Sequence, residues 1–275
     1  MKPIARALAD ATRRLSETSD TARLDSELLM AEALNIDRDR LLLSPPDREV
    51  PDRFWRMVER RRADEPVAYI TGRRAFWNIE LHVGPGVLVP RPDSEVLIAS
   101  AIEHFGGTAG PGRILDLGTG PGTLLLAALD VWPKATGLGI DVSRQAMSYA
   151  GANARRLGFE SRVKFKLGDW AEGIKESFDL ILCNPPYVAE GADLGPGVHE
   201  YEPDEALFAG EEGLDSYRAL APELPRLLNP RGIAAMEIGP DQGAQVTALL
   251  ARDGLQARIA ADLADRPRAV LLTWI

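Results

Sequence analysis

The stretch Ile114-Leu115-Asp116-Leu117-Gly118-Thr119-Gly120-Pro121-Gly122 decides how the chain is organised. It begins with apolar residues around one Asp, a pattern typical of a buried strand in a parallel sheet. Glycines then occupy alternate positions, where they permit a sharp turn and let the backbone approach a ligand. Residues 122–131 follow as a helix, whose N-terminus favours an electronegative group. A strand, a glycine turn and a helix in this order predict a binding site for a nucleotide-like ligand.

Strands and helices alternate from Arg113 to the end of the chain. The predicted strands are 113–118, 135–141, 163–168, 178–183, 231–238, 255–261 and 268–274. The predicted helices are 94–105 before the first strand, and then about 122–131, 143–157, 214–228 and 241–253. Such alternation predicts an α/β fold with a Rossmann-like, doubly wound, seven-stranded and mostly parallel sheet.

The first part of the chain follows other periods. Apolar residues recur at helical spacing within residues 3–62, which predicts a small N-terminal helical bundle. Between Phe76 and Val83 the period is two, which predicts a β-hairpin ended by Gly84-Pro85-Gly86. We therefore expect a helical domain, a β-hairpin linker and a catalytic domain over residues 1–74, 75–90 and 91–275.

Composition and charge exclude several classes of protein. The 275 residues carry a formal net charge of −9, and an acidic chain is a poor general binder of nucleic acid. No apolar run is long enough for a signal peptide or a membrane span. The single cysteine, Cys183, forms no intramolecular disulfide and is expected to be a buried thiol in a reduced cytoplasm. His82, His104 and His199 are too scattered for a metal site. We expect a cytoplasmic monomer without metal, membrane or direct nucleic-acid contacts.

The negative charge is concentrated in one loop. The first 85 residues hold 15 acidic and 15 basic side chains, whereas no Lys or Arg lies between Lys175 and Arg218. The acids after residue 189 in this window are Glu190, Asp193, Glu200, Glu202, Asp204, Glu205, Glu211, Glu212 and Asp215. One interpretation is an acidic rim for a basic protein segment; the other is a solvated loop.

Two further acids follow the glycine turn at strand ends. Asp141 ends the second strand about 20 residues on, where a carboxylate can accept both hydroxyls of a ribose. Asp169 ends the third strand, and Trp170 after it is placed to stack on an adenine. The spacing Asp-x-Gly-x-Gly-x-Gly resembles the S-adenosylmethionine loop of class I methyltransferases, in which Asp116 would lie near the methionine ammonium. The proline at position 121, where a small residue is common, removes one backbone donor.

The fourth strand ends in the turn Asn184-Pro185-Pro186-Tyr187, stiffened by two prolines. The Asn184 side-chain oxygen and the Pro185 carbonyl can accept both hydrogens of a planar –NH2 group and hold its nitrogen in line with a methyl on sulfur. No general base is required, because the methylated cationic amide is a strong acid. Tyr187 supplies a flat wall. Adenine or cytosine amines of nucleic acid and glutamine of protein both fit this chemistry.

These two motifs define the predicted site. The predicted cofactor-binding residues are Asp116, Gly118, Thr119, Gly120, Pro121, Gly122, Asp141, Asp169 and Trp170, to which the family resemblance described next adds Asn184. The predicted catalytic residues are Asn184, Pro185 and Tyr187. The predicted substrate-binding residues are Asn184, Pro185, Pro186 and Tyr187.

Other segments along nearly the whole chain are similar to one family. They are Glu65-Pro66-Val67-Ala68-Tyr69-Ile70-Thr71-Gly72, Phe76-Trp77, Val89-Pro90-Arg91-Pro92-Asp93-Ser94-Glu95, Tyr201-Glu202-Pro203, Gly213-Leu214-Asp215 and Glu237-Ile238-Gly239. With the two motifs above, the chain resembles the protein-(glutamine-N5) methyltransferases, and most closely the release factor glutamine methyltransferase (PrmC/HemK) family. Departures from the family pattern are Pro121, Cys183 where Ser is common, and His199 where Arg is frequent.

The resemblance implies a function. It implies a class I methyltransferase that uses S-adenosyl-L-methionine to methylate the glutamine of the Gly-Gly-Gln motif in peptide chain release factors, in support of translation termination. It also implies that the N-terminal helical domain helps to dock the release factor. Alternatives remain open: glutamine methylation of a ribosomal protein, amino-group methylation of nucleic acid, and a nucleotide-binding scaffold without catalysis. For Glu237, a structural role and a place in the cofactor site are both open.

Overall fold

The computed structural model describes residues 3–262 and 264–275 and divides into two compact units. The helical unit contains the chain up to Arg73 together with Leu194–Tyr201, and the sheet unit contains Arg74–Asp193 and Glu202–Ile275. Part of the acidic loop therefore belongs with the helices. A sequence-only division into consecutive domains could not show this, because it treats neighbours in the chain as neighbours in space.

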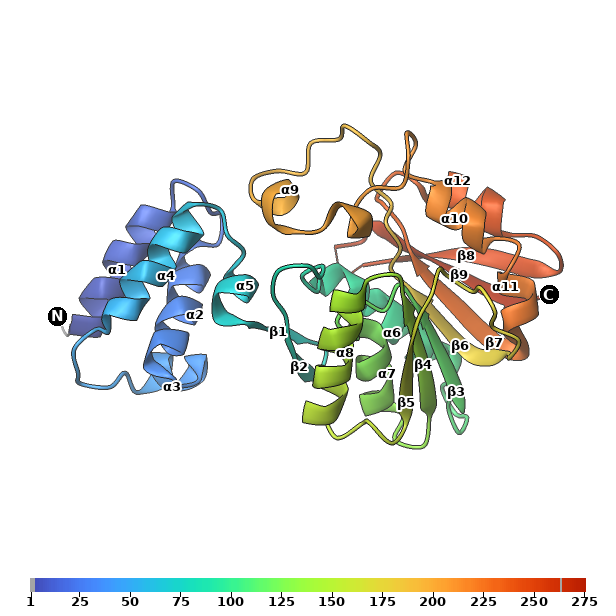
Figure 1. Ribbon diagram of the computed structural model, residues 1–275, viewed down its shortest axis with the longest axis horizontal. Helices are drawn as coiled ribbons and strands as arrows, with labels where there is room; N and C mark the ends of the chain where they lie inside the picture. Colours follow the sequence, from blue (N-terminus) through green and yellow to red (C-terminus); the bar gives the residue numbers. More distant parts are fainter. Residues whose placement is uncertain (1–2, 263) are drawn as a thin grey trace. The chain divides into compact units, whose positions relative to one another are not determined.

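The helical unit is the bundle predicted from the apolar spacing (Figure 1). Its helices are α1 (Pro3–Leu15), α2 (Ala22–Leu34), α3 (Arg38–Leu43), α4 (Asp52–Arg62), α5 (Val67–Thr71) and the short α9 (Val198–Tyr201). Helix α1 buries Ile4, Ala7, Ala11 and Leu15, which lie three or four residues apart and so share one helix face. The Tyr201 hydroxyl donates to the Ala63 carbonyl at 3.0 Å and ties α9 to this unit.

The sheet unit contains the predicted seven-stranded sheet, in the spatial order β5-β4-β3-β6-β7-β9-β8. Its strands are β3 (Arg113–Leu117), β4 (Thr136–Asp141), β5 (Val163–Leu167), β6 (Phe178–Cys183), β7 (Leu228–Glu237), β8 (Leu255–Ala261) and β9 (Pro267–Trp274). Strands β3 to β7 pair in parallel, whereas β9 is antiparallel to β7 and β8. The connection between β8 and β9 is too short for a parallel crossover. The predicted hairpin, β1 (Arg73–Phe76) and β2 (Ile79–His82), forms a separate two-stranded sheet.

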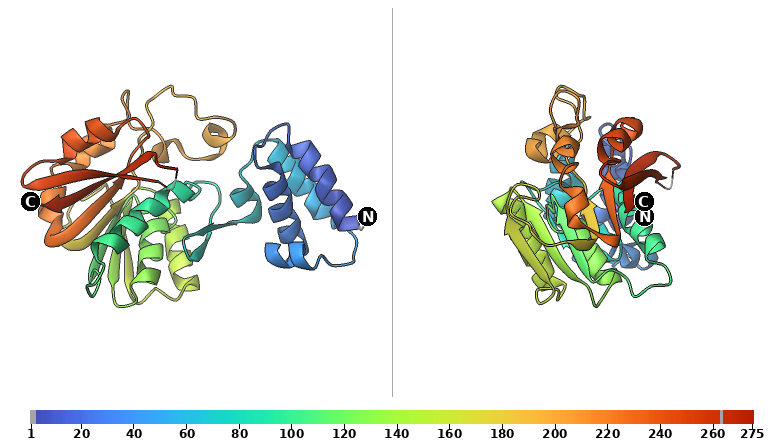
Figure 2. Two further views of the ribbon diagram at one scale, coloured as in Figure 1. Left: turned by 180° about the vertical axis from the view of Figure 1, so that it is seen from behind. Right: turned by 90° about the vertical axis from the view of Figure 1, so that its right-hand side faces the viewer.

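Helices cover both faces of the sheet (Figures 1 and 2). One face carries α6 (Glu95–His104), α7 (Thr123–Val131) and α8 (Arg144–Arg156); the other carries α10 (Asp215–Leu220), α11 (Leu224–Leu227) and α12 (Gly243–Leu250). The 3-10 turns are η1 (Pro92–Ser94) and η2 (Asp204–Ala206). The prediction of one helix over 214–228 is wrong. Pro222 and Pro225 have no backbone N–H to continue the helical ladder, so two short helices form, and β7 already begins at Leu228.

The strand register aligns the residues at the carboxyl edge of the sheet. Leu117 of β3 is paired with Ile140 of β4 and with Cys183 of β6, and Cys183 is paired with Met236 of β7. All four are at most 1% exposed, so the buried core holds this register firmly. The next residues along the four strands are Gly118, Asp141, Asn184 and Glu237, which therefore end their strands at one level.

Candidate active site

A cavity opens at this edge of the sheet, within the sheet unit. It holds about 940 Å³ of empty space, its open mouth included. The predicted residues that line it are Asp116, Gly118, Thr119, Gly120, Pro121, Asp141, Trp170, Asn184 and Pro186. Gly122, Asp169, Pro185 and Tyr187 are not part of its wall. The two predicted motifs are thus brought together, although not every residue in them faces the cavity.

The glycine turn adopts backbone angles that favour glycine. Gly118, Gly120 and Gly122 have φ of 70°, 56° and 89°, in the left-handed region that L side chains rarely adopt. The Gly120 N–H donates to one oxygen of Asp141 at 2.8 Å, and the Ser143 N–H donates to the other at 2.8 Å. Asp141 therefore holds the turn in place and keeps unused lone pairs on both oxygens. Burial raises the pKa of Asp141, despite these hydrogen bonds.

Asp116 is a buried carboxylate with one unpaired oxygen. Its Oδ2 accepts hydrogen bonds from the Thr119 hydroxyl at 2.6 Å and from the Leu125 N–H at 3.2 Å. Within the described chain, its Oδ1 has no hydrogen-bond partner. Burial raises the pKa of Asp116 to about 7. A buried acceptor without a partner is costly, and at the wall of a cavity it is suited to a cationic donor such as an amino-acid ammonium group.

Trp170 and Asn184 approach each other across Gly118. A Cβ on Gly118 would lie 3.6 Å from the Trp170 ring and 3.9 Å from the Asn184 carbonyl oxygen. The missing side chain at Gly118 thus lets the Trp170 ring and Asn184 share one wall of the cavity. Asp169, by contrast, is exposed beside Trp170.

Pro121 is tied to the hairpin by its carbonyl group. That carbonyl accepts a hydrogen bond from the Asn153 side-chain amide at 2.9 Å. Asn153 is fully buried and also bonds both backbone groups of His82 on β2, at 2.7 Å and 3.0 Å. Pro121 makes this contact through its carbonyl group, so the absence of a backbone N–H does not affect it. Asn153 escaped prediction because its partners are 71 and 32 residues away in sequence.

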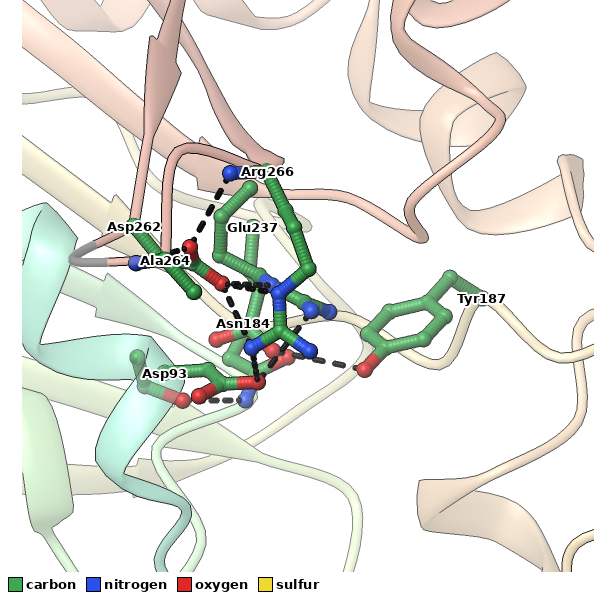
Figure 3. A network of polar contacts seen from close by, with 9 residues as sticks. Asp93, Asn184, Tyr187, Glu237, Asp262, Ala264 and Arg266 are labelled. Atoms are coloured by element: carbon green, nitrogen blue, oxygen red, sulfur yellow. Dashed lines mark hydrogen bonds and ion pairs between the residues drawn. The ribbon is translucent and has the colours of Figure 1, made fainter.

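The turn after β6 orients Asn184 through a contact that the sequence did not predict. The Asn184 side-chain N–H donates to the Ser94 hydroxyl oxygen at 3.1 Å, which leaves Oδ1 of Asn184 to accept from another group. Tyr187 lies beside Glu237, with its hydroxyl donating to Oε1 of Glu237 at 3.4 Å (Figure 3). Glu237, for which two roles were open, is therefore placed behind the turn and not in the cavity wall.

The acidic loop does not act as one exposed surface. Glu202 is 4% exposed, accepts the Val89 N–H at 2.9 Å and pairs with Arg91, which lines the cavity. Glu212 and Asp215 both pair with Arg218. Glu202 is therefore wrongly counted in the acidic rim, because its partner Arg91 was too distant in sequence to be recognised.

Other candidate residues have no part in the site. Cys183 is a fully buried residue of β6, and burial raises the pKa of its thiol. Among the residues that the structure describes, no cluster of three or more His, Cys, Asp or Glu side chains is arranged to hold a metal ion. No helix in the described ranges is long and apolar enough to cross a membrane.

A Rossmann-like sheet, a glycine turn and an acidic wall define an S-adenosylmethionine-dependent methyltransferase of class I. Residues 111–253 match the family described as a methyltransferase domain, and residues 6–72 match the PrmC N-terminal domain. The chain is 42% identical over 255 residues to the release factor glutamine methyltransferase of Rhodospirillum rubrum, covering 90% of this chain and 78% of that protein. It is 40% identical over 271 residues to the release factor glutamine methyltransferase of Cereibacter sphaeroides, covering 96% of each. The chain therefore belongs to the release factor glutamine methyltransferase family.

The fold is also similar to solved structures. The 16S rRNA N2 G1207 methyltransferase of T. thermophilus, in complex with AdoMet and guanosine, matches with a TM-score of 0.52 and 21% identity. The match covers 74% of this chain and 49% of that chain. At this identity the likeness supports the fold alone.

Proposed function

We propose that the protein transfers a methyl group from S-adenosylmethionine to the side-chain amide nitrogen of the glutamine in the Gly-Gly-Gln motif of peptide chain release factors. The observation that carries this proposal is the orientation of Asn184 beside the cavity, with Nδ2 bonded to Ser94 and Oδ1 left as an acceptor. The names of its relatives in Rhodospirillum rubrum and Cereibacter sphaeroides support the choice of substrate.

The cavity wall fits the methyl donor. Oδ1 of Asp116 would accept the ammonium group, the free lone pairs of Asp141 would accept the ribose hydroxyls, and the Trp170 ring would pack on the adenine. When bound, S-adenosylmethionine supplies an electrophilic methyl group on a positively charged sulfur. Gly118 and Gly120 leave the backbone bare at the wall, so that a ligand can approach it closely. Asp169 stays a prediction in this scheme, because it is exposed outside the wall.

The turn would hold the substrate amide by its hydrogens. Oδ1 of Asn184 and the carbonyl of Pro185 would each accept one N–H, which fixes the nitrogen and stabilises the positive charge that develops on it. The acidic cationic amide then loses its proton to water. A glutamate side chain has no N–H to offer these two oxygens and would place its own oxygens against them. The same geometry therefore selects glutamine over glutamate.

The remaining assignments concern the whole protein. In the proposed function, the helical domain over residues 1–74 docks the release factor. The protein acts as a cytoplasmic monomer and touches no nucleic acid, in keeping with its net charge of −9.

Transfer of labelled methyl groups tests the proposal. Purified protein and S-adenosylmethionine are incubated with a release factor, and with the same factor carrying alanine at the Gly-Gly-Gln glutamine. We expect one methyl group on the peptide of the first factor and none on the second, by mass spectrometry. Methylation of a ribosomal protein or of nucleic acid instead would overturn the substrate assignment. Calorimetry without any S-adenosylmethionine binding would favour the scaffold alternative.

A further inference from the structure

Glu237 is a buried acid behind the catalytic turn, outside the cavity. It ends β7, is 1% exposed and accepts the Tyr187 hydroxyl on Oε1 at 3.4 Å (Figure 3). In the described part of the chain, its Oε2 meets no donor at normal hydrogen-bond geometry. Such an acid costs stability, since burial raises its pKa to about 7. A buried carboxylate with an unused oxygen is an acceptor for any hydroxyl beside it.

Ser94 lies between Glu237 and the substrate-binding amide. It is 2% exposed, at the end of η1, and its oxygen accepts the Asn184 side-chain N–H at 3.1 Å. The Ser94 hydroxyl also lies near enough to the Glu237 carboxyl to lower its pKa against the effect of burial, while Oε2 of Glu237 stays without a donor at normal hydrogen-bond geometry among the described residues. A hydroxyl has a single hydrogen to donate. If that hydrogen goes to Glu237, the Ser94 oxygen can only accept from Asn184.

We propose that Ser94 and Glu237 form a relay that decides which end of the Asn184 amide faces the substrate. The ionised Glu237 accepts the Ser94 hydrogen, Ser94 then accepts the Asn184 N–H, and Oδ1 of Asn184 is turned toward the glutamine. Glu237 and Ser94 are thus positioning residues that act through Asn184. This inference rests on the proposed function for the identity of the group that Oδ1 receives.

Hydrogen-bond direction is what distinguishes the two amide orientations, because they have nearly the same shape. If residue 237 donates to the Ser94 oxygen, as a glutamine could, Ser94 can donate its own hydrogen to Oδ1 of Asn184. The amide then presents its –NH2 to the substrate –NH2, donor against donor, and the substrate nitrogen is no longer held in line. Packing alone cannot prevent this rotation, because oxygen and NH2 fill similar volumes.

Two variants test the relay with little change of volume. Glu237→Gln keeps the shape but adds a donor, and Ser94→Ala removes the link. We expect each to lower kcat in single-turnover methyl transfer by about 10- to 100-fold, since misplaced reacting groups cost rates of this order. The Kd for S-adenosylmethionine should stay unchanged. Ser100→Ala is the matched control, because Ser100 is a buried serine on α6, 5% exposed, outside the cavity wall.

The double variant separates a relay from two independent roles. If both residues act through Asn184, Ser94→Ala with Glu237→Gln should be about as slow as the slower single variant. Losses that multiply would overturn the relay, and so would a Glu237→Gln rate equal to that of the unaltered protein.

A spectroscopic readout keeps the inference independent of the substrate. In NMR spectra of the protein, the two side-chain amide hydrogens of Asn184 should shift and broaden in Glu237→Gln and Ser94→Ala, but not in Ser100→Ala. Unchanged Asn184 amide resonances would overturn the relay even if no release factor were methylated. Failure of the unaltered protein to methylate release factors, with the expected NMR changes, would overturn only the proposed function.

Discussion

Asp116 and Glu237 are two buried acids of the same sheet that share an unpaired carboxylate oxygen but lie in different surroundings. Each is 1% exposed, each has a pKa that burial raises to about 7, and each has one oxygen without a partner at hydrogen-bond geometry in the described residues. Asp116 lies in the cavity wall, where a ligand can complete its contacts. Glu237 lies behind the turn of residues 184–187, where it accepts the Tyr187 hydroxyl and where Ser94 and Arg268 lower its pKa against the effect of burial.

The difference shows that a buried acid with an unpaired oxygen, although it lowers stability, can serve either ligand binding or the ordering of a neighbouring turn. An acid with an unpaired oxygen among the residues that line a cavity favours binding, because its charge attracts a cationic ligand. An acceptor behind a turn instead keeps the turn ordered, because it determines which neighbouring group donates in each hydrogen bond. Changes at Asp116 should therefore alter cofactor affinity, whereas changes at Glu237 should alter the rate of transfer.

Removal of the Asn184 side chain should have the largest effect on rate. Asn184→Ala deletes one of the two oxygens that hold the substrate amide, and we expect kcat to fall by about 10²–10³ or more. Single-turnover methyl transfer measures this fall, and calorimetry should show an S-adenosylmethionine Kd close to that of the unaltered protein. An equal loss of cofactor affinity would contradict the substrate-holding role proposed for Asn184.

Neutralising Asp116 should weaken cofactor binding and leave the turn of residues 184–187 intact. Asp116→Asn keeps the shape but removes the charge, and a hydrogen bond to a charged group contributes about 1.5–3 kcal/mol. We expect the Kd for S-adenosylmethionine to rise by about 10- to 100-fold in calorimetry. At saturating cofactor the transfer rate should recover, in contrast with Glu237→Gln. A kcat that stays low at saturation would place Asp116 in the chemical step.

The pH dependence of cofactor affinity should follow Asp116. Its pKa of about 7 means that the acid is neutral at lower pH and must lose its proton before it can pair with an ammonium group. The Kd should therefore rise as pH falls below 7, by at most about tenfold per unit. Asp116→Asn should flatten this slope, which separates it from any contribution of Asp141 in the same wall. Glu237→Gln should leave the slope unchanged. A flattened slope in this variant would contradict the assignment of the pH dependence to Asp116.

The sequence was sufficient for elements defined by local pattern. Apolar runs and the glycine turn predicted the strands and the cofactor loop, since burial and backbone conformation follow from adjacent residues. It was insufficient where the partner is distant. Ser94 was predicted to begin a helix and belonged to a segment similar to the family, but nothing near it in sequence indicates Asn184, 90 residues away. The placement of Glu237 needed the register of β6 and β7, which aligns Cys183 with Met236.

The acidic loop illustrates the same limit. Its charge was evident from the sequence, but the burial of Glu202 depends on Arg91, 111 residues earlier. The assignment of Leu194–Tyr201 to the helical unit likewise depends on contacts such as that between Tyr201 and Ala63. Charge counts along a chain do not distinguish an acid in solvent from one in a buried ion pair.

Restoring a backbone donor in the glycine turn should have the smallest effect. Pro121→Ala returns the N–H that proline lacks, while the carbonyl at this position continues to accept from Asn153. We expect the Kd for S-adenosylmethionine to change by less than about threefold, a difference below 1 kcal/mol. Calorimetry on this variant is compared with Asn153→Ala, which removes the link to His82 and should weaken both the turn and thermal stability. If Pro121→Ala instead tightened binding tenfold or more, the missing N–H would limit the affinity for S-adenosylmethionine. The backbone of the glycine turn would then determine this affinity together with the unpaired carboxylate of Asp116.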